Sequence, residues 1–367
     1  MSRMTTPPFA STLTPNQAGR TDAERTAILA DPGFGNYFTD HMFLTEWTPQ
    51  DGWHDARVVP YGPLSLDPAT AVLHYAQEIF EGLKAYSHAD GSVWLFRPDA
   101  NAARLQRSAH RLALPSLPED WFVGAIRALV EADRAWVPQG GETSLYLRPF
   151  MFASEVFLGV RPSQHVTFSV IASPAGAYFP GGVKPVSIWL STEYSRAGAG
   201  GTGAAKCGGN YAASLLPQQE AAQHGCQQVA FLDSTENRWI EELGGMNLYF
   251  VQSDGTIVTP ELSGSILEGI TRESILTIAR DLGHEVVERR VSIDEWRQGA
   301  ADGTITEVFA CGTAAVVTPV GTLKWDGGEV TAGDGDAGKI TMDVRSALVD
   351  VQYGRAEDRH GWMHRVV

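Results

Sequence analysis

The chain has 367 residues, 43% of them hydrophobic and 19% charged, which is typical of a globular protein of about two domains. Its formal net charge of −15 argues against nucleic acid or an anionic membrane surface as a partner. Its apolar runs are too short for a transmembrane helix, and its three cysteines fit neither a disulfide framework nor a zinc site. We therefore expect a cytoplasmic protein without a bound metal.

The first half of the sequence alternates between strand-like and helix-like segments. Residues 1–30 are rich in Thr and Pro, and we expect them to be flexible and not a signal peptide. Asp90-Gly91 between two apolar runs indicates a hairpin, and Pro98 suits the first turn of a helix. The pattern predicts strands at 42–47, 83–86, 92–96, 143–150 and 165–172, a helix or helical turn at 69–80, and helices at 98–112 and from Pro118 onward.

The second half follows a Pro- and Gly-rich stretch that begins at Ser173. Gly283 is placed to end a helix, and Ser292 with Glu295 forms a capping box. The pattern predicts strands at 186–191, 228–233, 248–252, 256–259 and 304–310, and helices at 210–224, at 270–282, after Ser292 and at 340–351. This mixture predicts two α+β domains, a smaller one at 31–178 and a larger one at 193–367, joined by a linker at 179–192.

A glycine-rich loop in the second half contains Gly198, Gly200 and Gly203, which satisfy the pattern G-x-G-x-x-G. In a dinucleotide site, a strand runs directly into these glycines and a helix begins at them. Here residues 192–197 separate the strand from the glycines, and the helical pattern begins only at about Asn210. A dinucleotide site is therefore disfavoured, although an NAD-dependent oxidoreductase stays as an alternative.

The same loop contains Lys206, one of only five lysines in the chain. Its neighbours Ala205 and Cys207 are small, and glycines lie on both sides, so a planar group can approach the backbone closely. A lysine held among small apolar residues can have a lowered pKa and act as a nucleophile. From the residues alone, a solvated loop lysine is an equal alternative.

Two segments, Lys206-Cys-Gly-Gly-Asn-Tyr211 and Glu242-Leu-Gly-Gly-Met-Asn247, resemble motifs of the branched-chain amino-acid aminotransferases. These are pyridoxal-phosphate (PLP) enzymes of fold type IV. Five further similar segments follow the same order, at 80–84, 95–98, 144–149, 176–182 and 312–315. The resemblance implies a two-domain α+β fold with PLP in the cleft between the domains. It also implies a ping-pong transfer of the amino group between L-leucine, L-isoleucine or L-valine and 2-oxoglutarate.

The resemblance further implies which residues bind the cofactor. Lys206, in the larger domain, would form the Schiff base and move the proton during catalysis. Glu242 would keep the pyridine nitrogen protonated, and Tyr211 would bond to the ring oxygen. Four residues would bind the phosphate, two of them at a helix start whose free N–H groups favour an anion: Arg104, Ile270, Thr271 and Thr313. Without the resemblance, Glu242 would be a surface charge and Tyr211 a core aromatic residue.

Substrate roles are implied in the same way. Four aromatic residues would line the side-chain pocket: Phe34, Phe80, Tyr146 and Tyr178. Arg148 would meet the distal carboxylate of glutamate, and Thr313 and Ala314 would present N–H groups to the α-carboxylate. Three residues would be inserted by a partner subunit, which predicts a homodimer: Tyr75, Leu158 and Val160. Taken alone, each aromatic residue is also a plausible core residue.

One departure from the family and several alternatives remain. Relatives of the mammalian mitochondrial type carry a C-x-x-C pair where this sequence has Ala315 and Thr318, so we expect no thiol switch there. D-amino-acid aminotransferase and aminodeoxychorismate lyase share the implied fold and are alternative activities. A catalytically inactive metabolite-binding protein is a third possibility.

Overall fold

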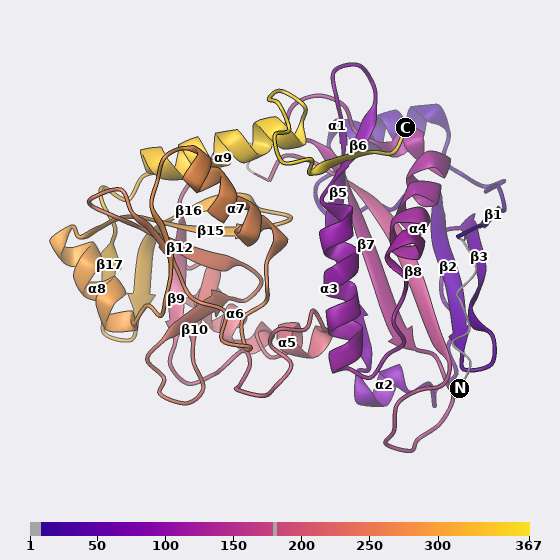
Figure 1. Cartoon of the computed structure of the whole chain (residues 1–367), viewed down its shortest axis with the longest axis horizontal. Helices are drawn as coiled ribbons and strands as arrows, with labels where there is room; N and C mark the ends of the chain where they lie inside the picture. Colours follow the sequence, from indigo (N-terminus) through magenta and orange to yellow (C-terminus); the bar gives the residue numbers. More distant parts are fainter. Residues whose placement is uncertain (1–8, 179–181) are drawn as a thin grey trace. The chain divides into compact units, whose positions relative to one another are not determined.

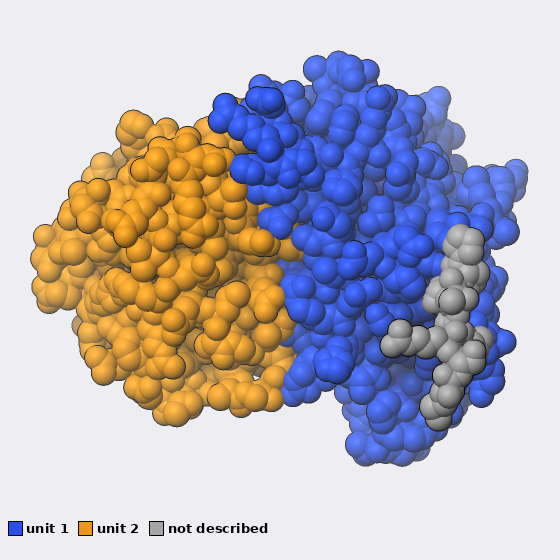
Figure 2. Space-filling view, viewed as in Figure 1, with its two compact units in different colours: residues 1–178, 205–208, 352–367 blue, residues 179–204, 209–351 orange. Residues whose placement is uncertain are grey.

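The computed structural model describes residues 9–178 and 182–367, which form two compact units. Unit 1 contains the described residues up to Tyr178 together with Ala205–Gly208 and Gln352–Val367 (Figure 2). Unit 2 contains residues 182–204 and 209–351. Within these residues, no helix combines the length and the apolar character needed to cross a membrane.

The described part of unit 1 is built on a nine-stranded sheet with the order β1-β3-β2-β8-β7-β5-β6-β18, and β4 pairs with β7. Its strands are β1 (Thr12–Leu13), β2 (His41–Thr48), β3 (Gly52–Pro60), β4 (Glu78–Phe80), β5 (Leu83–Ser87), β6 (Val93–Phe96), β7 (Ser144–Ala153), β8 (Val166–Ala175) and β18 (Met363–Arg365). Its helices are α1 (Asp22–Ala30), α2 (Val72–Tyr75), α3 (Pro98–Arg111) and α4 (Glu119–Ala132), with a 3-10 turn η1 (Arg134–Trp136).

Helices α3 and α4 cover one face of this sheet and form the core of unit 1 with it (Figure 1). Leu105 of α3 and Leu129 of α4 are buried in the same cluster as Leu145 and Leu147 of β7. Because side chains alternate along a strand, the intervening β7 residues, including Tyr146 and Arg148, lie on the other face. The helices therefore leave one face of β7 free for a functional site.

The described part of unit 2 contains a second nine-stranded sheet with the order β11-β10-β9-β16-β15-β12-β13-β14, and β17 pairs with β16. Strand β9 is parallel to both β10 and β16. The strands are β9 (Val186–Ser191), β10 (Gln228–Leu232), β11 (Ile240–Leu243), β12 (Asn247–Gln252), β13 (Ile257–Thr259), β14 (Val286–Glu288), β15 (Ile305–Gly312), β16 (Val316–Trp325) and β17 (Gly328–Thr331). The helices are α5 (Gly208–Ala212), α6 (Leu215–Gln223), α7 (Ile270–Asp281), α8 (Ile293–Asp302) and α9 (Lys339–Gln352).

The predicted strands and most predicted helices are confirmed, and two helices differ. Where a helix or a helical turn is expected at 69–80, the structure has the single turn α2, which ends because Ala76 adopts a left-handed conformation with φ of 47°; strand β4 follows it. The helix expected at 210–224 is divided into α5 and α6, with Ser214 as the N-cap of α6. The segment expected to be flexible contains α1, which is stabilised by a capping box between Thr21 and Glu24.

The compact units also differ from the expected domain boundaries. The last residues belong to unit 1 because β18 pairs with β6. Ala205–Gly208, with Lys206, also belong to unit 1, because their backbone is bonded to α3 and β4. Of the expected linker at 179–192, residues 179–181 lie outside the described residues, and 186–191 form β9. Regular pairing of β9 on both edges makes it part of the sheet.

Candidate active site

Lys206 lies in unit 1, where its backbone is held on two sides. Its N–H donates to Ser108 Oγ of α3 at 2.9 Å, and its carbonyl accepts from Phe80 N at 2.9 Å. Its Nζ atom lies 4.8 Å from the centre of the Phe80 ring. Although the residue keeps part of its surface exposed, desolvation lowers the pKa of its amine to about 8, and the charge of Arg104 acts in the same direction. A neutral, nucleophilic amine is therefore accessible near neutral pH.

Arg104 of α3 forms a buried ion pair with Glu81, which follows β4. Its Nε and Nη2 atoms donate to the two carboxylate oxygens, each at 2.8 Å, and Asn101 Nδ2 donates to Oε2 at 2.7 Å. Burial raises the pKa of Glu81, but the charge and hydrogen bonds of Arg104, with the charge of Lys206, outweigh burial and lower it. Glu81 is therefore ionised, and two nitrogens of the expected phosphate ligand are already engaged.

Arg148 and three of the predicted aromatic residues form one cluster on the free face of β7. The guanidinium carbon lies 4.7 Å from the centre of the Phe80 ring, and Nη2 donates to Tyr146 Oη at 3.0 Å. Phe34 packs edge-on against Tyr146 with ring centres 5.0 Å apart. Arg148 Nε is buried without a hydrogen-bond partner. An apolar wall with one incompletely bonded guanidinium is what a pocket for both aliphatic and acidic side chains requires.

Unit 1 also contains other predicted substrate residues, which are Tyr178 after β8 and the three residues expected to enter a partner's site. Tyr178 follows β8 near the end of the unit, and burial raises the pKa of its hydroxyl. Tyr75 of α2 donates a hydrogen bond to the carbonyl of Leu158 in the loop after β7. Leu158 is 63% exposed and Val160 is 89% exposed. The three residues expected to enter a partner's site therefore lie on the surface.

Glu242 lies in unit 2 on β11 and is held in a buried ion pair. Its Oε1 atom lies 2.9 Å from Arg196 Nη1 and accepts from Leu267 N at 2.8 Å. Both side chains are at most 2% exposed, while Arg196 Nε and Nη2 are buried without hydrogen-bond partners. A buried carboxylate that is paired with a cation can accept a hydrogen bond from a proton-bearing ring nitrogen.

The remaining predicted cofactor residues of unit 2 lie near the turn after β11. Tyr211 of α5 packs close to Gly245, within 3.5 Å of where a Cβ atom would be, and Gly312 approaches Met246 in the same turn. Helix α7 begins at Ile270, and Thr271 is buried in its first turn. Its N-cap is Gly269, which supplies no side-chain cap. No N-cap side chain occupies the first N–H groups of α7, and the start of a helix is where an anion binds favourably.

This turn of α7 is set by close packing against β12. A Cβ atom on Gly269 would overlap Asn247 Oδ1, whose amide Nδ2 donates to Leu267 O at 3.1 Å. Thr313 and Ala314 follow β15, directly after Gly312. The structure thus gathers Tyr211, Glu242 and the β15 turn around β11 and β12.

The glycine-rich loop has a structural explanation that does not involve a dinucleotide. No helix begins at its glycines, since α5 starts at Gly208. A Cβ atom on Gly203 would overlap the backbone of Ser265, so a glycine is needed for close packing within unit 2. The oxidoreductase alternative loses its only support.

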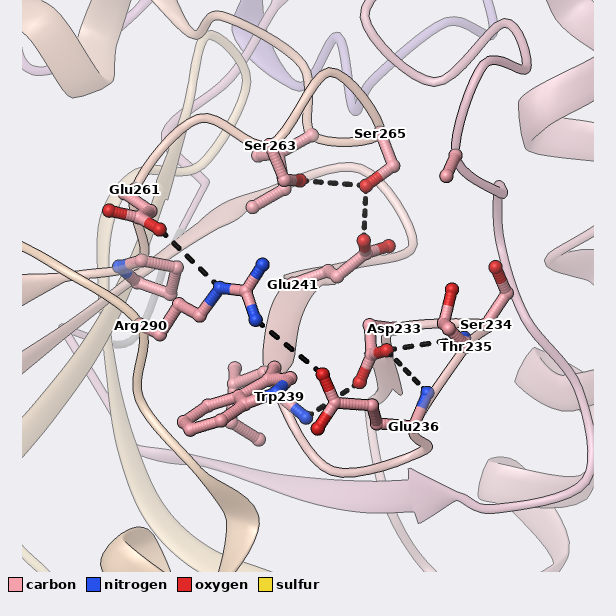
Figure 3. Close-up of a pocket in the computed structure, with 14 residues that line it drawn as sticks. Asp233, Ser234, Thr235, Glu236, Trp239, Glu241, Glu261, Ser263, Ser265 and Arg290 are labelled. Carbon is pink, nitrogen blue, oxygen red and sulfur yellow. Dashed lines mark hydrogen bonds and ion pairs between the residues drawn. The ribbon is translucent and has the colours of Figure 1, made fainter.

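A hollow on unit 2 does not coincide with the predicted site. Figure 3 shows Glu241 pointing toward Ser265 and Arg290 lying between two acidic side chains. Arg290 is 3.4 Å from Glu261 and 3.6 Å from Glu236. Glu241 and Glu242 point to opposite faces of β11, because they are adjacent on a strand. None of the predicted site residues lines this hollow.

The ion-pair partners of the predicted residues, and the residues that hold their backbone, were not predicted from the sequence. Glu81 lies in a segment that resembles the family, but its role as the partner of Arg104 was not identified. Arg196 and Ser108 were also missed, because each contacts a residue distant in sequence, and so was Glu78, which accepts a hydrogen bond from Gly208 N.

Comparisons with known proteins place the chain in a family. Residues 78–323 match the family described as amino-transferase class IV. A probable branched-chain-amino-acid aminotransferase of Streptomyces coelicolor is 62% identical over 362 residues, which cover 98% of this chain and 99% of the relative. The branched-chain-amino-acid aminotransferase of Mycolicibacterium smegmatis is 59% identical over 367 residues, covering 99% of this chain and all of the relative.

A solved structure agrees with this assignment. The Escherichia coli branched-chain amino acid aminotransferase superposes with a TM-score of 0.75 at 31% identity, covering 89% of this chain and 99% of that one. The chain is therefore a class IV aminotransferase with the two-domain fold of type IV. Within that class it belongs to the branched-chain amino-acid aminotransferases.

Proposed function

We propose that this enzyme transfers the amino group of L-leucine, L-isoleucine or L-valine to 2-oxoglutarate with PLP as its cofactor. The observation that carries the proposal is the Lys206 amine, whose pKa is lowered to about 8 beside two arginines and one ionised glutamate. PLP supplies an aldehyde that reacts with amines and a ring that withdraws electrons from the substrate α-carbon. The family assignment supports the same reaction.

The residues of unit 1 fit an anionic, aldehyde-bearing cofactor. A neutral amine is needed to bind an aldehyde, and desolvation makes the neutral form of Lys206 accessible. Arg104, Arg148 and Lys206 together carry more positive charge than Glu81 offsets, which suits a phosphate and a carboxylate. Arg104 is proposed to contribute charge to the phosphate site while Glu81 fixes its orientation.

Lys206 is proposed to be the base that moves the proton at the substrate α-carbon. Its backbone is bonded to Ser108 and Phe80, so the side chain starts from a fixed point. An amine whose pKa is about 8 can both accept and return a proton near neutral pH. Phe80 beneath Nζ limits the approach of water.

The predicted residues of unit 2 are proposed to bind the pyridine ring and the phosphate of the cofactor. Glu242, held by Arg196, would accept a hydrogen bond from the protonated ring nitrogen, and Tyr211 would donate a hydrogen bond to the ring oxygen. The first turn of α7, with Ile270 and Thr271, and Thr313 after β15 would bind phosphate oxygens through N–H and O–H donors. Ala314, next to Thr313, would offer its N–H to the substrate α-carboxylate.

Arg148 and the aromatic cluster are proposed to select the substrate side chain. Phe34, Phe80 and Tyr146, with Tyr178, would surround a branched aliphatic group, while the Arg148 guanidinium would bind the distal carboxylate of 2-oxoglutarate.

The first test is the visible spectrum of the purified enzyme before and after addition of L-leucine. We expect the absorbance of lysine-bound cofactor to be replaced by that of its amino form, and Lys206→Ala to abolish the change. Lys184→Ala, at an exposed position, is the control. Reaction with D-alanine but not with L-leucine would favour the D-amino-acid aminotransferase and contradict the proposal.

We also propose that the active form is a homodimer in the cytoplasm. Val156, Leu158 and Val160 in the loop after β7, with Leu73 and Tyr75 of α2, expose apolar side chains in one region of unit 1. Such a cluster of apolar side chains is typical of a contact surface, and the resemblance assigns it to a second copy. The buried, unpaired thiols of the three cysteines are compatible with a reducing compartment.

Sedimentation analysis of Leu158→Asp tests the dimer. The variant is expected to shift toward the monomer and to lose activity in parallel, because a charge would be buried at the contact. Leu282→Asp, at a residue of similar type that is 43% exposed in unit 2, is the control. A Leu158→Asp protein that sediments and reacts like the wild type would overturn this part of the proposal.

A further inference from the structure

A half-buried carboxylate lies on the same face of the sheet as the proposed substrate residues. Glu78 is the first residue of β4 and pairs with Phe152 of β7. Residues two apart on a strand share a face, so Phe152 lies on the side that carries Arg148 and Tyr146. Glu78 is therefore an acidic residue in the aromatic cluster that the proposed reaction does not use.

The carboxylate of Glu78 also holds the segment that carries Lys206. Its Oε1 atom accepts a hydrogen bond from Gly208 N, and a Cβ atom on Gly208 would overlap it. Phe80, two residues further on β4, donates its N–H to the Lys206 carbonyl at 2.9 Å. Strand β4 thus holds the backbone at the Lys206 carbonyl and at Gly208, two residues further on, and Glu78 supplies the second of these attachments.

The charge of Glu78 is coupled to that of Arg148. Burial raises the pKa of Glu78, and the Gly208 N–H and then the positive charge of Arg148 act in the opposite direction without cancelling that rise. Arg148 itself donates to the hydroxyl oxygen of Tyr146 and keeps one buried nitrogen without a hydrogen-bond partner. Glu78 thus acts on Arg148 through its charge.

A pocket that accepts both leucine and glutamate has a problem that this arrangement addresses. When an aliphatic side chain occupies the pocket, the Arg148 guanidinium has no anionic partner from the substrate and its burial is unfavourable. When glutamate occupies it, an arginine without any nearby negative charge would bind the dicarboxylate too strongly relative to leucine. A nearby carboxylate that does not block the guanidinium would moderate both effects.

We propose that Glu78 determines the balance between acidic and aliphatic substrates by offsetting the charge of Arg148. The inference rests on the proposed function, in which Arg148 meets the distal carboxylate of glutamate. Glu78 acts as a positioning residue, through Arg148 and the Lys206 segment, and takes no part in proton transfer.

Two unreactive ligands and three variants test this proposal on the cofactor-loaded enzyme. Glutarate represents the acidic side chain and 4-methylpentanoate the aliphatic one, and calorimetry measures both dissociation constants. Glu78→Gln removes the charge but keeps an oxygen that can accept from Gly208 N. Glu78→Asp keeps the charge but shortens the side chain by one methylene. Glu131→Gln removes a charge from an exposed position of α4 as the matched control.

Glu78→Gln is expected to bind glutarate about 5-fold more tightly, the change that corresponds to about 1 kcal/mol for a like-charge interaction in a half-buried site. The same variant is expected to bind 4-methylpentanoate equally or more weakly. Its kcat/KM ratio of L-glutamate to L-leucine is expected to rise by a similar factor. Glu78→Asp is expected to keep the wild-type ratio of the two dissociation constants even where both affinities fall, and Glu131→Gln to change nothing.

A purely structural role would change the dissociation constants of both ligands by the same factor. That result overturns the proposal, and so does a Glu78→Gln protein in which neither dissociation constant changes. Failure of the proposed function has a different signature: the wild-type enzyme would not transfer the amino group of L-leucine, and the inference would fall with it. If the wild type is active but the ratio of the two dissociation constants in Glu78→Gln lies within twofold of the wild-type ratio, the inference about Glu78 is wrong and the proposed function stands.

Discussion

Replacement of Lys206 by methionine is expected to abolish transamination and, at the same time, to stabilise the cofactor-free protein. The lysine amine is desolvated in the folded state, where its pKa is about 8, compared with 10.5 for the ordinary group. Protonated Lys206 is therefore less favourable in the folded chain than in the unfolded chain. Methionine has a similar shape and carries no charge, so this unfavourable contribution disappears.

The size of the effect follows from the difference in pKa. A fall of about 2.5 in pKa corresponds to about 3 kcal/mol of unfolding free energy. Because Lys206 keeps part of its surface exposed, we expect a gain of about 1–3 kcal/mol at pH 7. Between pH 8 and 10.5 the folded state binds fewer protons than the unfolded state, so wild-type stability rises with pH there. The difference in unfolding free energy between the variant and the wild type is thus largest below pH 8 and vanishes above pH 10.5.

Urea unfolding of both cofactor-free proteins at equal protomer concentration and at several pH values measures this difference. Lys184→Met, which replaces an exposed lysine, is the control and is expected to change stability by less than about 0.5 kcal/mol. A Lys206→Met protein that is no more stable than the wild type at pH 7 would refute the reasoning, as would an advantage that does not change between pH 7 and pH 10.

Two further predictions concern unit 2. Glu242→Ala is expected to lower the unfolding free energy by about 3–5 kcal/mol, because it leaves Arg196 buried without its carboxylate partner. Equilibrium urea unfolding measures this loss, and a change below about 1 kcal/mol would contradict a stabilising buried ion pair. Gly269→Ala is expected to weaken PLP binding at least about 10-fold while the protein stays folded, because its Cβ would displace Asn247 and the start of α7. Fluorescence titration with PLP measures the affinity, and Gly62→Ala, where a Cβ would meet no atom within 4 Å, should bind like the wild type.

Local sequence signals predicted the elements well where they act over a few residues. Pro98 at a helix start, Gly283 at a helix end and Asp90-Gly91 in a hairpin all have physical causes within one turn of chain, and each element formed as expected. Of the helix or helical turn expected at 69–80, only the turn at 72–75 formed, because Glu78–Phe80 pair with β7, a tertiary contact that periodicity cannot show. The membership of 205–208 and 352–367 in unit 1 was missed for the same reason.

The candidate site shows the same division. Lys206 could be singled out by its small neighbours and by the family motif, which are properties of contiguous residues. Its lowered pKa depends on burial and on Arg104, which is 102 positions away in the sequence. The partners Glu81 and Arg196 gave no local signal, since an ion pair between distant residues leaves no pattern in either segment.

The order of residues by itself determined the class of enzyme, the lysine, and the short elements around them, because motifs and caps act between neighbours in the chain. Only the tertiary structure decided which charges meet: Glu81 with Arg104, Glu242 with Arg196, and Glu78 near Arg148. Electrostatic energy depends on distance in space and on exclusion of water, and neither quantity exists until the strands and helices have packed.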